Sequence, residues 1–252
     1  MNTDEFSNKA QNKAYGVRVG LLLRNIEKID DEFYRLAALC YEEKIEVIFK
    51  GGCLLRHILR SIGTKVHRGT EDIDFDMYIN SYEKFIEVMG TSVSVGKLRD
   101  NLQMNIHLVG LNIDCDVKIL DDGLDYPRIL YEGKYGKFWG VTVEDMLADK
   151  IASVSGRFII GRVKDIFDIQ VITTTKNLSF DISVLRALLK LREMGDFSVI
   201  ETEEARIYKA LRDYTKEPEN VLRHTLVFID GIKSEKNQQW NGRAWIDLGN
   251  TL

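Results

Sequence analysis

Residues 49–78 have the sequence FKGGCLLRHILRSIGTKVHRGTEDIDFDMY, and this stretch decides the predicted fold. A short β-rich run leads into two glycines and then into apolar residues at helical spacing. After a basic loop, acidic and apolar residues alternate, with Asp72, Asp74 and Asp76 at every second position. Alternate residues of a strand share a face, so we expect the three carboxylates on one side of this strand.

Such an acidic strand face predicts a divalent cation site. Gathered negative charge is costly next to an apolar layer unless a cation accompanies it. Mg²⁺ prefers oxygen ligands and usually shares its coordination sphere with water and substrate phosphates. A solvated strand at the edge of a sheet would show the same alternation, so the pattern alone leaves both interpretations open.

A second acidic strand follows further along the chain. Residues 111–120, LNIDCDVKIL, place Asp114 and Asp116 on one face and apolar residues on the other. Residues 102–109, LQMNIHLV, precede them after a single Gly110, which predicts an antiparallel pair of strands. The two acidic strands together could supply the carboxylates for one ion or for two.

The glycine pair predicts a phosphate site. Gly51 and Gly52 begin a helix, with Arg56 on a face away from its apolar stripe and Gly63 as its C-terminal stop. A helix N-terminus presents unpaired N–H groups and a positive dipole end, and glycine lets a phosphate approach closely. Two adjacent glycines after a strand are also typical of a simple tight turn.

Two charged motifs follow in the second half of the sequence. Thr142 and Asp145 resemble a capping box at the start of a helix, in which Lys150 borders the apolar stripe. Lys150 could point toward a triphosphate or lie on the helix surface. Further on, Asp165 and Asp168 are three residues apart and share a helix face, where they could also anchor a lysine by ion pairing.

The composition fits a soluble globular protein that uses no disulfides. The 252 residues are 44% hydrophobic and 29% charged, with a net charge of −4, which excludes a globally basic nucleic-acid binder. Cys40, Cys53 and Cys115 are scattered and odd in number, which fits a reducing cytosol, so we expect a cytoplasmic protein. There is no bilayer-spanning apolar run and no signal-peptide core.

The order of the elements predicts an α+β protein of two parts. We expect residues 1–140 to form a mixed β-sheet flanked by helices, including one at 17–42. Residues 141–252 are expected to form a helical domain that contributes Lys150 and Asp165 to a cleft. The loop with Pro127 separates the sheet from this domain, in which nearly everything after residue 162 is predicted to be helical. Its further helices are expected at 181–194, 202–214 and 218–231.

In combination, these motifs resemble the AbiEii-type nucleotidyltransferase toxins of the DNA polymerase β-like nucleotidyltransferase superfamily. The matching segments cover residues 45–172 in family order. They are FKGGCLLR (49–56), HRGTEDIDFD (67–76), DCDV (114–117), LADKIASVSGR (147–157) and GRVKDIFDI (161–169). One departure is Gly52, because superfamily members often have serine at this position.

The resemblance implies a Mg²⁺-dependent transfer of a nucleoside monophosphate from an NTP to an acceptor. It implies metal ligation by Asp72, Asp74 and Asp116, with Asp114 as the alternative third carboxylate and Asp76 in a supporting role. Further implied contacts to the nucleotide are made by Gly51, Gly52, Arg56, Arg68 and Lys150, and Asp165 would act as a base or an orienting residue.

The resemblance also implies the biological setting. Family members studied as toxins pair with a separately encoded antitoxin, and some modify tRNA ends. The resemblance therefore implies the toxin of a type IV toxin–antitoxin or phage-abortive-infection system. An antibiotic-like small molecule is the alternative acceptor. A nucleotide-binding module without catalysis and a metal-dependent nuclease are two further alternatives, since paired carboxylates also serve hydrolysis.

Overall fold

The computed structural model describes residues 26–64, 69, 70, 72–95, 103–108, 113–121, 126–156, 159–192, 195–234, 236 and 238–248. The chain divides into two compact units. One combines residues 1–58 with 68–141, and the other combines residues 59–67 with 142–252. None of the helices in the described ranges is both long enough and apolar enough to cross a bilayer.

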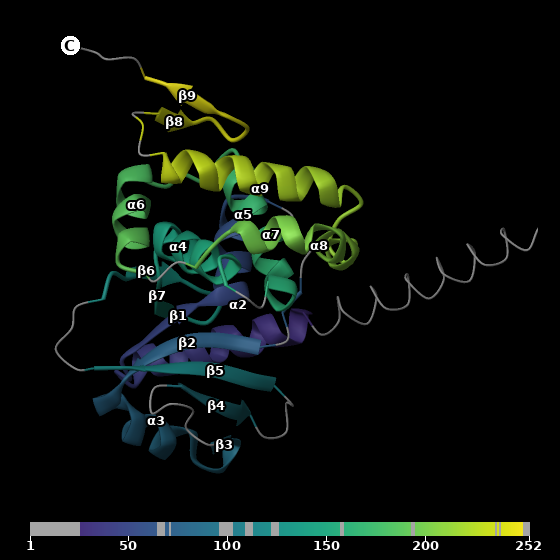
Figure 1. Cartoon of the computed structure of the whole chain (residues 1–252). Coiled ribbons are helices and arrows are strands. Elements are labelled where there is room, and N and C mark those ends of the chain that lie inside the picture. The colour runs from purple at the N-terminus through teal and green to yellow at the C-terminus, as the bar shows by residue number, and fades with distance from the viewer. Residues whose placement is uncertain are drawn as a thin grey trace, which may run out of the picture. The chain divides into compact units, whose positions relative to one another are not determined.

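A seven-stranded mixed sheet forms the centre of the first unit, in the order β3-β4-β5-β2-β1-β7-β6 (Figure 1). The pairs β2–β5 and β1–β7 are parallel, and the other neighbouring strands are antiparallel. The strands are β1 Val47–Lys50, β2 Asp72–Tyr78, β3 Val93–Val95, β4 Gln103–Leu108, β5 Ile113–Leu120, β6 Ile129–Glu132 and β7 Lys137–Gly140.

Helices pack on one face of this sheet through an aromatic core. A helix covers residues 26–42, and its Phe33 ring lies 5.3 Å from the Phe49 ring of β1. The ring centroids of Phe49 and Phe75 of β2 lie 5.4 Å apart, and those of Phe75 and Phe85 lie 5.9 Å apart. The other helical elements of this region are α2 Gly51–Ser61, η1 Ile79–Ser81, α3 Tyr82–Met89 and η2 Gly90–Ser92.

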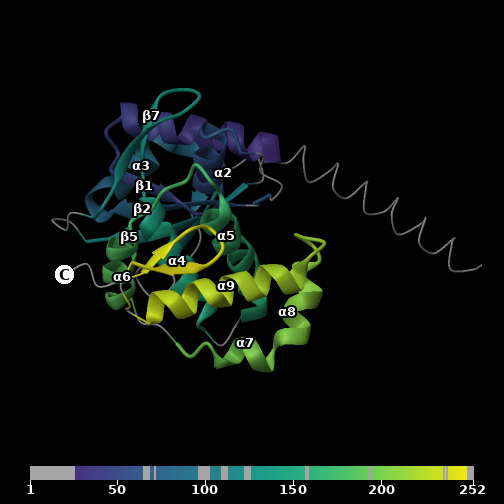
Figure 2. The same ribbon diagram turned by 90° about the horizontal axis from the view of Figure 1, so that it is seen from above.

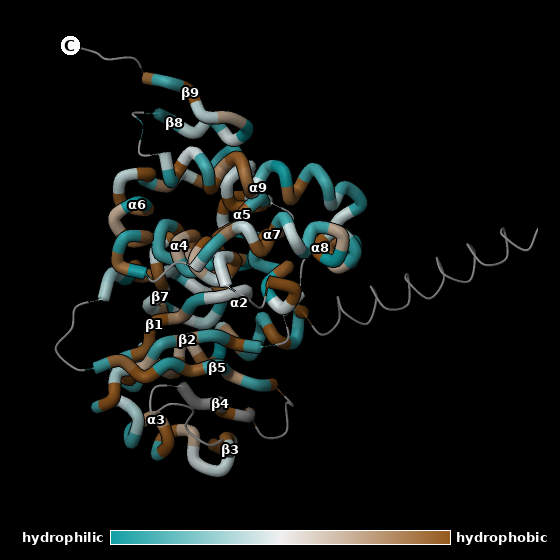
Figure 3. Tube along the Cα trace, in the orientation of Figure 1, coloured by the Kyte–Doolittle hydropathy of each residue, from teal (hydrophilic) through white to brown (hydrophobic). Residues whose placement is uncertain are grey.

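The two central strands alternate between this core and the opposite face. Ile73 and Phe75 of β2 are fully buried, as is Cys115 of β5, whereas the acidic residues between them are half-buried or exposed. Figure 3 shows the alternation as successive hydrophilic and hydrophobic segments along β2 and β5. The two acidic strands and the antiparallel partner of the second, β4, are therefore confirmed as predicted.

Helices make up most of the second unit. The elements are α4 Val143–Val154, η3 Ile159–Arg162, α5 Val163–Thr174, α6 Ile182–Lys190, α7 Ser198–Thr202, α8 Glu204–Leu211, α9 Pro218–Lys233, β8 Gln238–Trp240 and β9 Trp245–Asp247. The side chain of Thr142 accepts the N–H of Asp145, which confirms the predicted start of α4. A buried bond from Thr225 Oγ1 to the Ile166 carbonyl ties α9 to α5. The predicted α+β class, a mixed sheet followed by helices, is confirmed.

A β-hairpin corrects the prediction that nearly everything after residue 162 is helical. Strands β8 and β9 pair antiparallel and lie beside α9 (Figure 2). Trp240 Nε1 donates to the Thr173 carbonyl at 2.8 Å, and Trp245 Nε1 donates to the Val227 carbonyl at 3.0 Å. The two tryptophans therefore pack on the helices of this unit, because each indole N–H reaches a helix carbonyl while its ring buries apolar area.

Two further predictions differ from the structure. Part of the segment with Pro127, expected to be a loop, forms the hairpin of β6 and β7, and β7 pairs with β1. The helix predicted at 202–214 is shorter in the structure, where α8 covers only Glu204–Leu211. Thr202 is the last residue of the separate helix α7. The first residues of the helix predicted at 17–42 lie outside the described residues, and the rest is helical.

Candidate metal centre

The parallel pairing of β2 and β5 brings the two acidic strands side by side. Their register pairs Asp72 with Asp114 and Asp74 with Asp116. Directly paired residues of neighbouring strands point to the same face, with Cβ atoms about 5 Å apart. The four carboxylates therefore share the face opposite the aromatic core, as the alternation of the sequence predicts.

Three of these carboxylates converge. Asp72, Asp74 and Asp116 each offer an oxygen, and these oxygens all lie within 4.8 Å of one another. Asp72 and Asp74 are half-buried, and Asp116 is exposed. Among the described residues, the group of possible ligands includes Asp116 rather than Asp114, the alternative third carboxylate.

The cluster fits a hard divalent cation. Oxygens that share one Mg²⁺ at about 2.1 Å lie at most about 4.2 Å apart. The observed spread of up to 4.8 Å therefore needs only a small side-chain rotation to hold one ion, and it leaves room for two. The donors are all carboxylates, the ligands that Mg²⁺ prefers, and water and phosphate oxygens can complete its octahedral coordination.

Gly51 links this cluster to the start of α2. Its φ angle of +69° lies in the left-handed region that favours glycine, and a Cβ placed there would lie 1.8 Å from Asp74 Oδ2. The backbone at the start of α2 thus lies directly against a carboxylate of the cluster. No acidic residue occupies the first turn of α2, so the turn itself adds no repulsion toward a phosphate.

Neighbouring side chains hold Asp72 in place. Thr70 Oγ1 donates to Asp72 Oδ1 at 2.6 Å, and Cys53 Sγ contacts the Asp72 carbonyl at 3.5 Å. Burial raises the pKa of Cys53 to about 12, so this thiol stays protonated at neutral pH. The three cysteines are buried and free, as the scattered spacing predicts.

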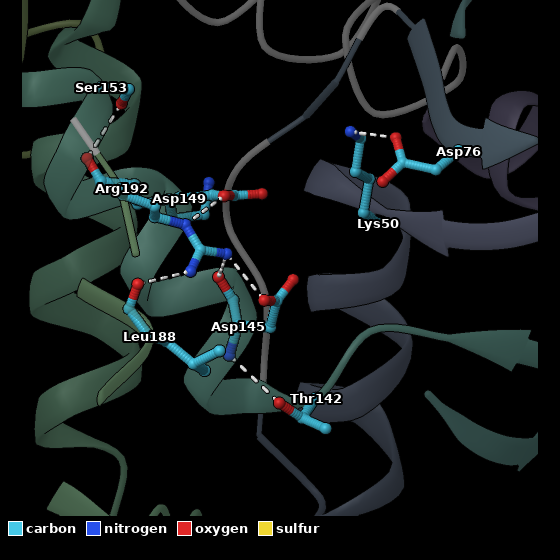
Figure 4. Close-up of polar contacts among 9 residues, drawn as sticks. Lys50, Asp76, Thr142, Asp145, Asp149, Ser153, Leu188 and Arg192 are labelled. Carbon is cyan, nitrogen blue, oxygen red and sulfur yellow. Dashed lines mark hydrogen bonds and ion pairs between the residues drawn. The ribbon is translucent and has the colours of Figure 1, made fainter. Parts of the chain in front are cut away.

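Asp76, the third acidic residue of β2, forms an ion pair with Lys50 (Figure 4). Lys50 is the last residue of β1, and its Cα pairs with that of Asp74. The residue patterns did not single out Lys50, although its place directly before the glycine pair was a signal that could have done so.

Arg56, one of the residues predicted to contact the nucleotide, forms a buried ion pair with Asp30. Arg56 is only 2% exposed, and its Nε donates to Asp30 Oδ1 at 2.8 Å. This buried pair joins α2 to the helix of residues 26–42. Arg68 lies outside the described residues, and the nucleotide contacts expected of both arginines stay predictions.

In the second unit, Lys150 is the centre of a buried charge cluster. Its Nζ lies 2.9 Å from Asp165 Oδ1 and 2.6 Å from Asp168 Oδ2. Ser153 Oγ donates to Asp165 Oδ2 at 3.0 Å. Burial would raise the pKa of Asp165, but the Lys150 ammonium and these hydrogen bonds hold it below its ordinary value. The ion pairing that the sequence left open for these aspartates is thus observed, and the expected contact of Lys150 with a triphosphate stays a prediction.

The second unit also contains a charged network around Arg192 that the sequence patterns did not predict. Arg192 donates to Asp145 Oδ1 at 2.6 Å and to Asp149 Oδ1 at 2.8 Å, and its Nη1 donates to the Leu188 carbonyl (Figure 4). Arg192 follows α6, and the two aspartates lie on α4. The partners are more than 40 residues apart, so no local pattern could indicate that this network joins the two helices.

Comparisons with known proteins find low similarity to two solved nucleotidyltransferase-type structures. No protein-family model matches the chain, and no curated protein matches it in sequence. The solved structure of MenT4, a nucleotidyltransferase toxin from Mycobacterium tuberculosis H37Rv, is 17% identical with a TM-score of 0.48, over 93% of this chain and 99% of that one. An antigenic nucleotidyltransferase-like protein from Paracoccidioides brasiliensis is 13% identical with a TM-score of 0.43, over 74% of this chain and 93% of that one. At TM-scores below 0.5 the function proposed for this chain rests on its own residues, and the AbiEii resemblance stays a prediction.

Proposed function

We propose that the protein is a Mg²⁺-dependent nucleotidyltransferase that moves a nucleoside monophosphate from an NTP to an acceptor. One observation carries this proposal. Asp72, Asp74 and Asp116 gather oxygens within 4.8 Å on one sheet face, and the first residue of α2 lies against Asp74. A carboxylate cluster beside a helix N-terminus combines a metal site with a phosphate site, which is what nucleotidyl transfer requires.

In this proposal the residues of the first unit bind and orient the nucleotide. Asp72, Asp74 and Asp116 hold the metal, and the backbone amides at Gly51 and Gly52 receive phosphate oxygens. Bound Mg²⁺ supplies charge stabilisation to the transferring phosphate and lowers the pKa of an attacking hydroxyl. Thr70 keeps the Asp72 carboxylate oriented toward its neighbours, since it donates to Oδ1 at 2.6 Å.

The remaining roles rest on the resemblance to the AbiEii-type toxins. It supports residues 141–252 as a helical domain whose Lys150 and Asp165 serve the same reaction, and Arg56 and Arg68 as further nucleotide contacts. It also supports an RNA acceptor such as a tRNA end, a separately encoded antitoxin, and a role as a toxin or in phage defence.

A transfer assay tests the proposal. The protein is incubated with Mg²⁺, each labelled NTP in turn and total cellular RNA, and label in the RNA is measured. We expect Asp74→Asn and Asp116→Asn to lower the transfer rate by about 10³-fold or more, because each removes a ligand that stabilises charge in the transition state. Asp114→Asn is the matched control, since this residue lies next to Asp116 on the same face and outside the converging group.

Three outcomes would contradict the proposal or its details. Transfer that is unchanged in Asp74→Asn would overturn the metal site. Equal losses in Asp114→Asn and Asp116→Asn would overturn the choice of the third carboxylate. Label on an aminoglycoside-like compound and none on RNA would replace the RNA acceptor with a small molecule, and RNA cleavage without any NTP would indicate a nuclease instead.

A further inference from the structure

Lys50 lies where β1 delivers the chain to α2. It is the last residue of the strand, it precedes Gly51 directly, and its Cα pairs with the Cα of Asp74. Residues paired across antiparallel strands share a face, with Cβ atoms about 5 Å apart. The Lys50 side chain therefore leaves the sheet on the carboxylate face, immediately beside one of the proposed metal ligands.

Asp76 fixes the ammonium group of Lys50 on this face. The two side chains form an ion pair (Figure 4). They are 23% and 16% exposed, so the pair is partly shielded from solvent and still accessible. Asp76 is the next residue after Asp74 on this face of β2, on the side away from Asp72. The ion pair with Asp76 therefore holds the Lys50 ammonium on the carboxylate face, close to the proposed metal ligands.

We propose that Lys50 is a phosphate ligand of the nucleotide and that Asp76 is the positioning residue that holds it. This inference rests on the proposed nucleotidyltransferase function. A lysine ammonium is a compact point charge suited to phosphate, and its three N–H donors are compatible with contacts to a carboxylate and to a phosphate at once. Lys50 adjoins both the carboxylate cluster and the first amides of α2, which are the two places where a metal-bound triphosphate is expected.

Lys118 provides a matched comparison on the same face. It lies on β5 and pairs in register with Asp76, so it has the same charge as Lys50 and lies beside the same acidic residue on the neighbouring strand. It is exposed and lies two strands away from β1 and the start of α2. The proposal therefore assigns the phosphate contact to Lys50 and expects none from Lys118.

Equilibrium binding of a non-hydrolysable NTP analogue with Mg²⁺, measured by calorimetry, tests this assignment. We expect Lys50→Met to weaken binding about tenfold or more, as for the loss of a charge-assisted hydrogen bond, and Lys118→Met to leave it unchanged. Lys50→Arg keeps the charge and the N–H donors, so it should retain affinity within about threefold. Thermal unfolding of each variant shows whether it is folded.

A double-mutant cycle tests the positioning role of Asp76. Asp76→Asn should weaken binding by less than Lys50→Met, and the double variant should bind no more weakly than Lys50→Met alone, because Asp76 acts through Lys50. Independent, additive losses would overturn the positioning role. Binding by folded Lys50→Met within twofold of the wild type would overturn the phosphate contact, even where the wild type transfers nucleotides. A wild type that neither binds nor transfers any NTP would overturn the proposed function itself.

Discussion

The two units each contain a cluster of aspartates, and the clusters are built in opposite ways. In the first unit Asp72, Asp74 and Asp116 converge on a sheet face with one exposed member. In the second, Asp165 and Asp168 close around the Lys150 ammonium and are almost fully buried. Buried carboxylates that share an ammonium depend on it, because its removal would leave buried charges without a counter-charge, whereas carboxylates that converge at an accessible surface are suited to a cation from solution.

The largest effect on stability is expected in the closed cluster. Lys150→Met removes the ammonium that two buried carboxylates share, which should lower the free energy of unfolding by about 3–5 kcal/mol in denaturant titration. The triple variant Lys150→Met, Asp165→Asn and Asp168→Asn should recover much of the lost free energy of unfolding, because all three buried charges are then removed. Asp74→Asn in the open cluster should cost little stability, since it relieves repulsion. A Lys150→Met protein as stable as the wild type would show that the buried aspartates do not depend on the lysine, and would contradict the difference drawn between the two clusters.

The next effect concerns the glycine that touches the open cluster. Gly51→Ala combines a positive φ with a contact to Asp74, so we expect a loss of about 3 kcal/mol in stability together with loss of transfer. Gly63→Ala is the control, because Gly63 also has a positive φ of +74° but open space around a Cβ. It should cost only about 1 kcal/mol and leave transfer intact. Equal losses in the two variants would show that backbone strain alone matters at Gly51.

Mg²⁺ should distinguish the clusters by its effect on thermal unfolding. A ligand at 100 times its Kd stabilises a protein by about 2.7 kcal/mol, so saturating Mg²⁺ should raise the Tm of the wild type by several degrees. The shift should disappear in Asp74→Asn and persist in Asp114→Asn. If Asp165→Asn abolished the shift instead, the assignment of the open cluster as the metal site would be wrong.

The smallest effect is a pH dependence of the closed cluster. The pKa of Asp165 is lower in the folded protein than its ordinary value of 3.8, so its stabilising contribution is complete above that value. The contribution is lost as the pH falls through the lower, folded pKa. We therefore expect the wild type to lose more stability than Asp165→Asn between pH 5 and acidic pH near 3, measured by urea unfolding at each pH. A steeper loss in the variant would contradict this.

Local patterns alone predicted much of the fold. Alternation in β2 and β5 separates acidic from apolar residues because side chains of a strand alternate between faces. The start of α4 at Thr142 and the start of α2 at Gly51 are set by residues within one helical turn. The two hairpins were missed because short strands such as β6 and β8 are stabilised by their partners and by the core rather than by their own composition.

The sequence by itself therefore determined which carboxylates face together, because that depends only on the period of a strand. Only the tertiary structure decided which of them meet, since the register of β2 against β5 pairs residues that are far apart in the sequence, such as Asp72 and Asp114. It also decided that Lys150 pairs with Asp165 and Asp168 and that Asp76 pairs with Lys50, because ion pairs form between side chains that the fold brings within a few ångströms. Both clusters consist of aspartates. The side chains around each aspartate in the folded protein determine whether it pairs with a lysine or can bind a cation from solution.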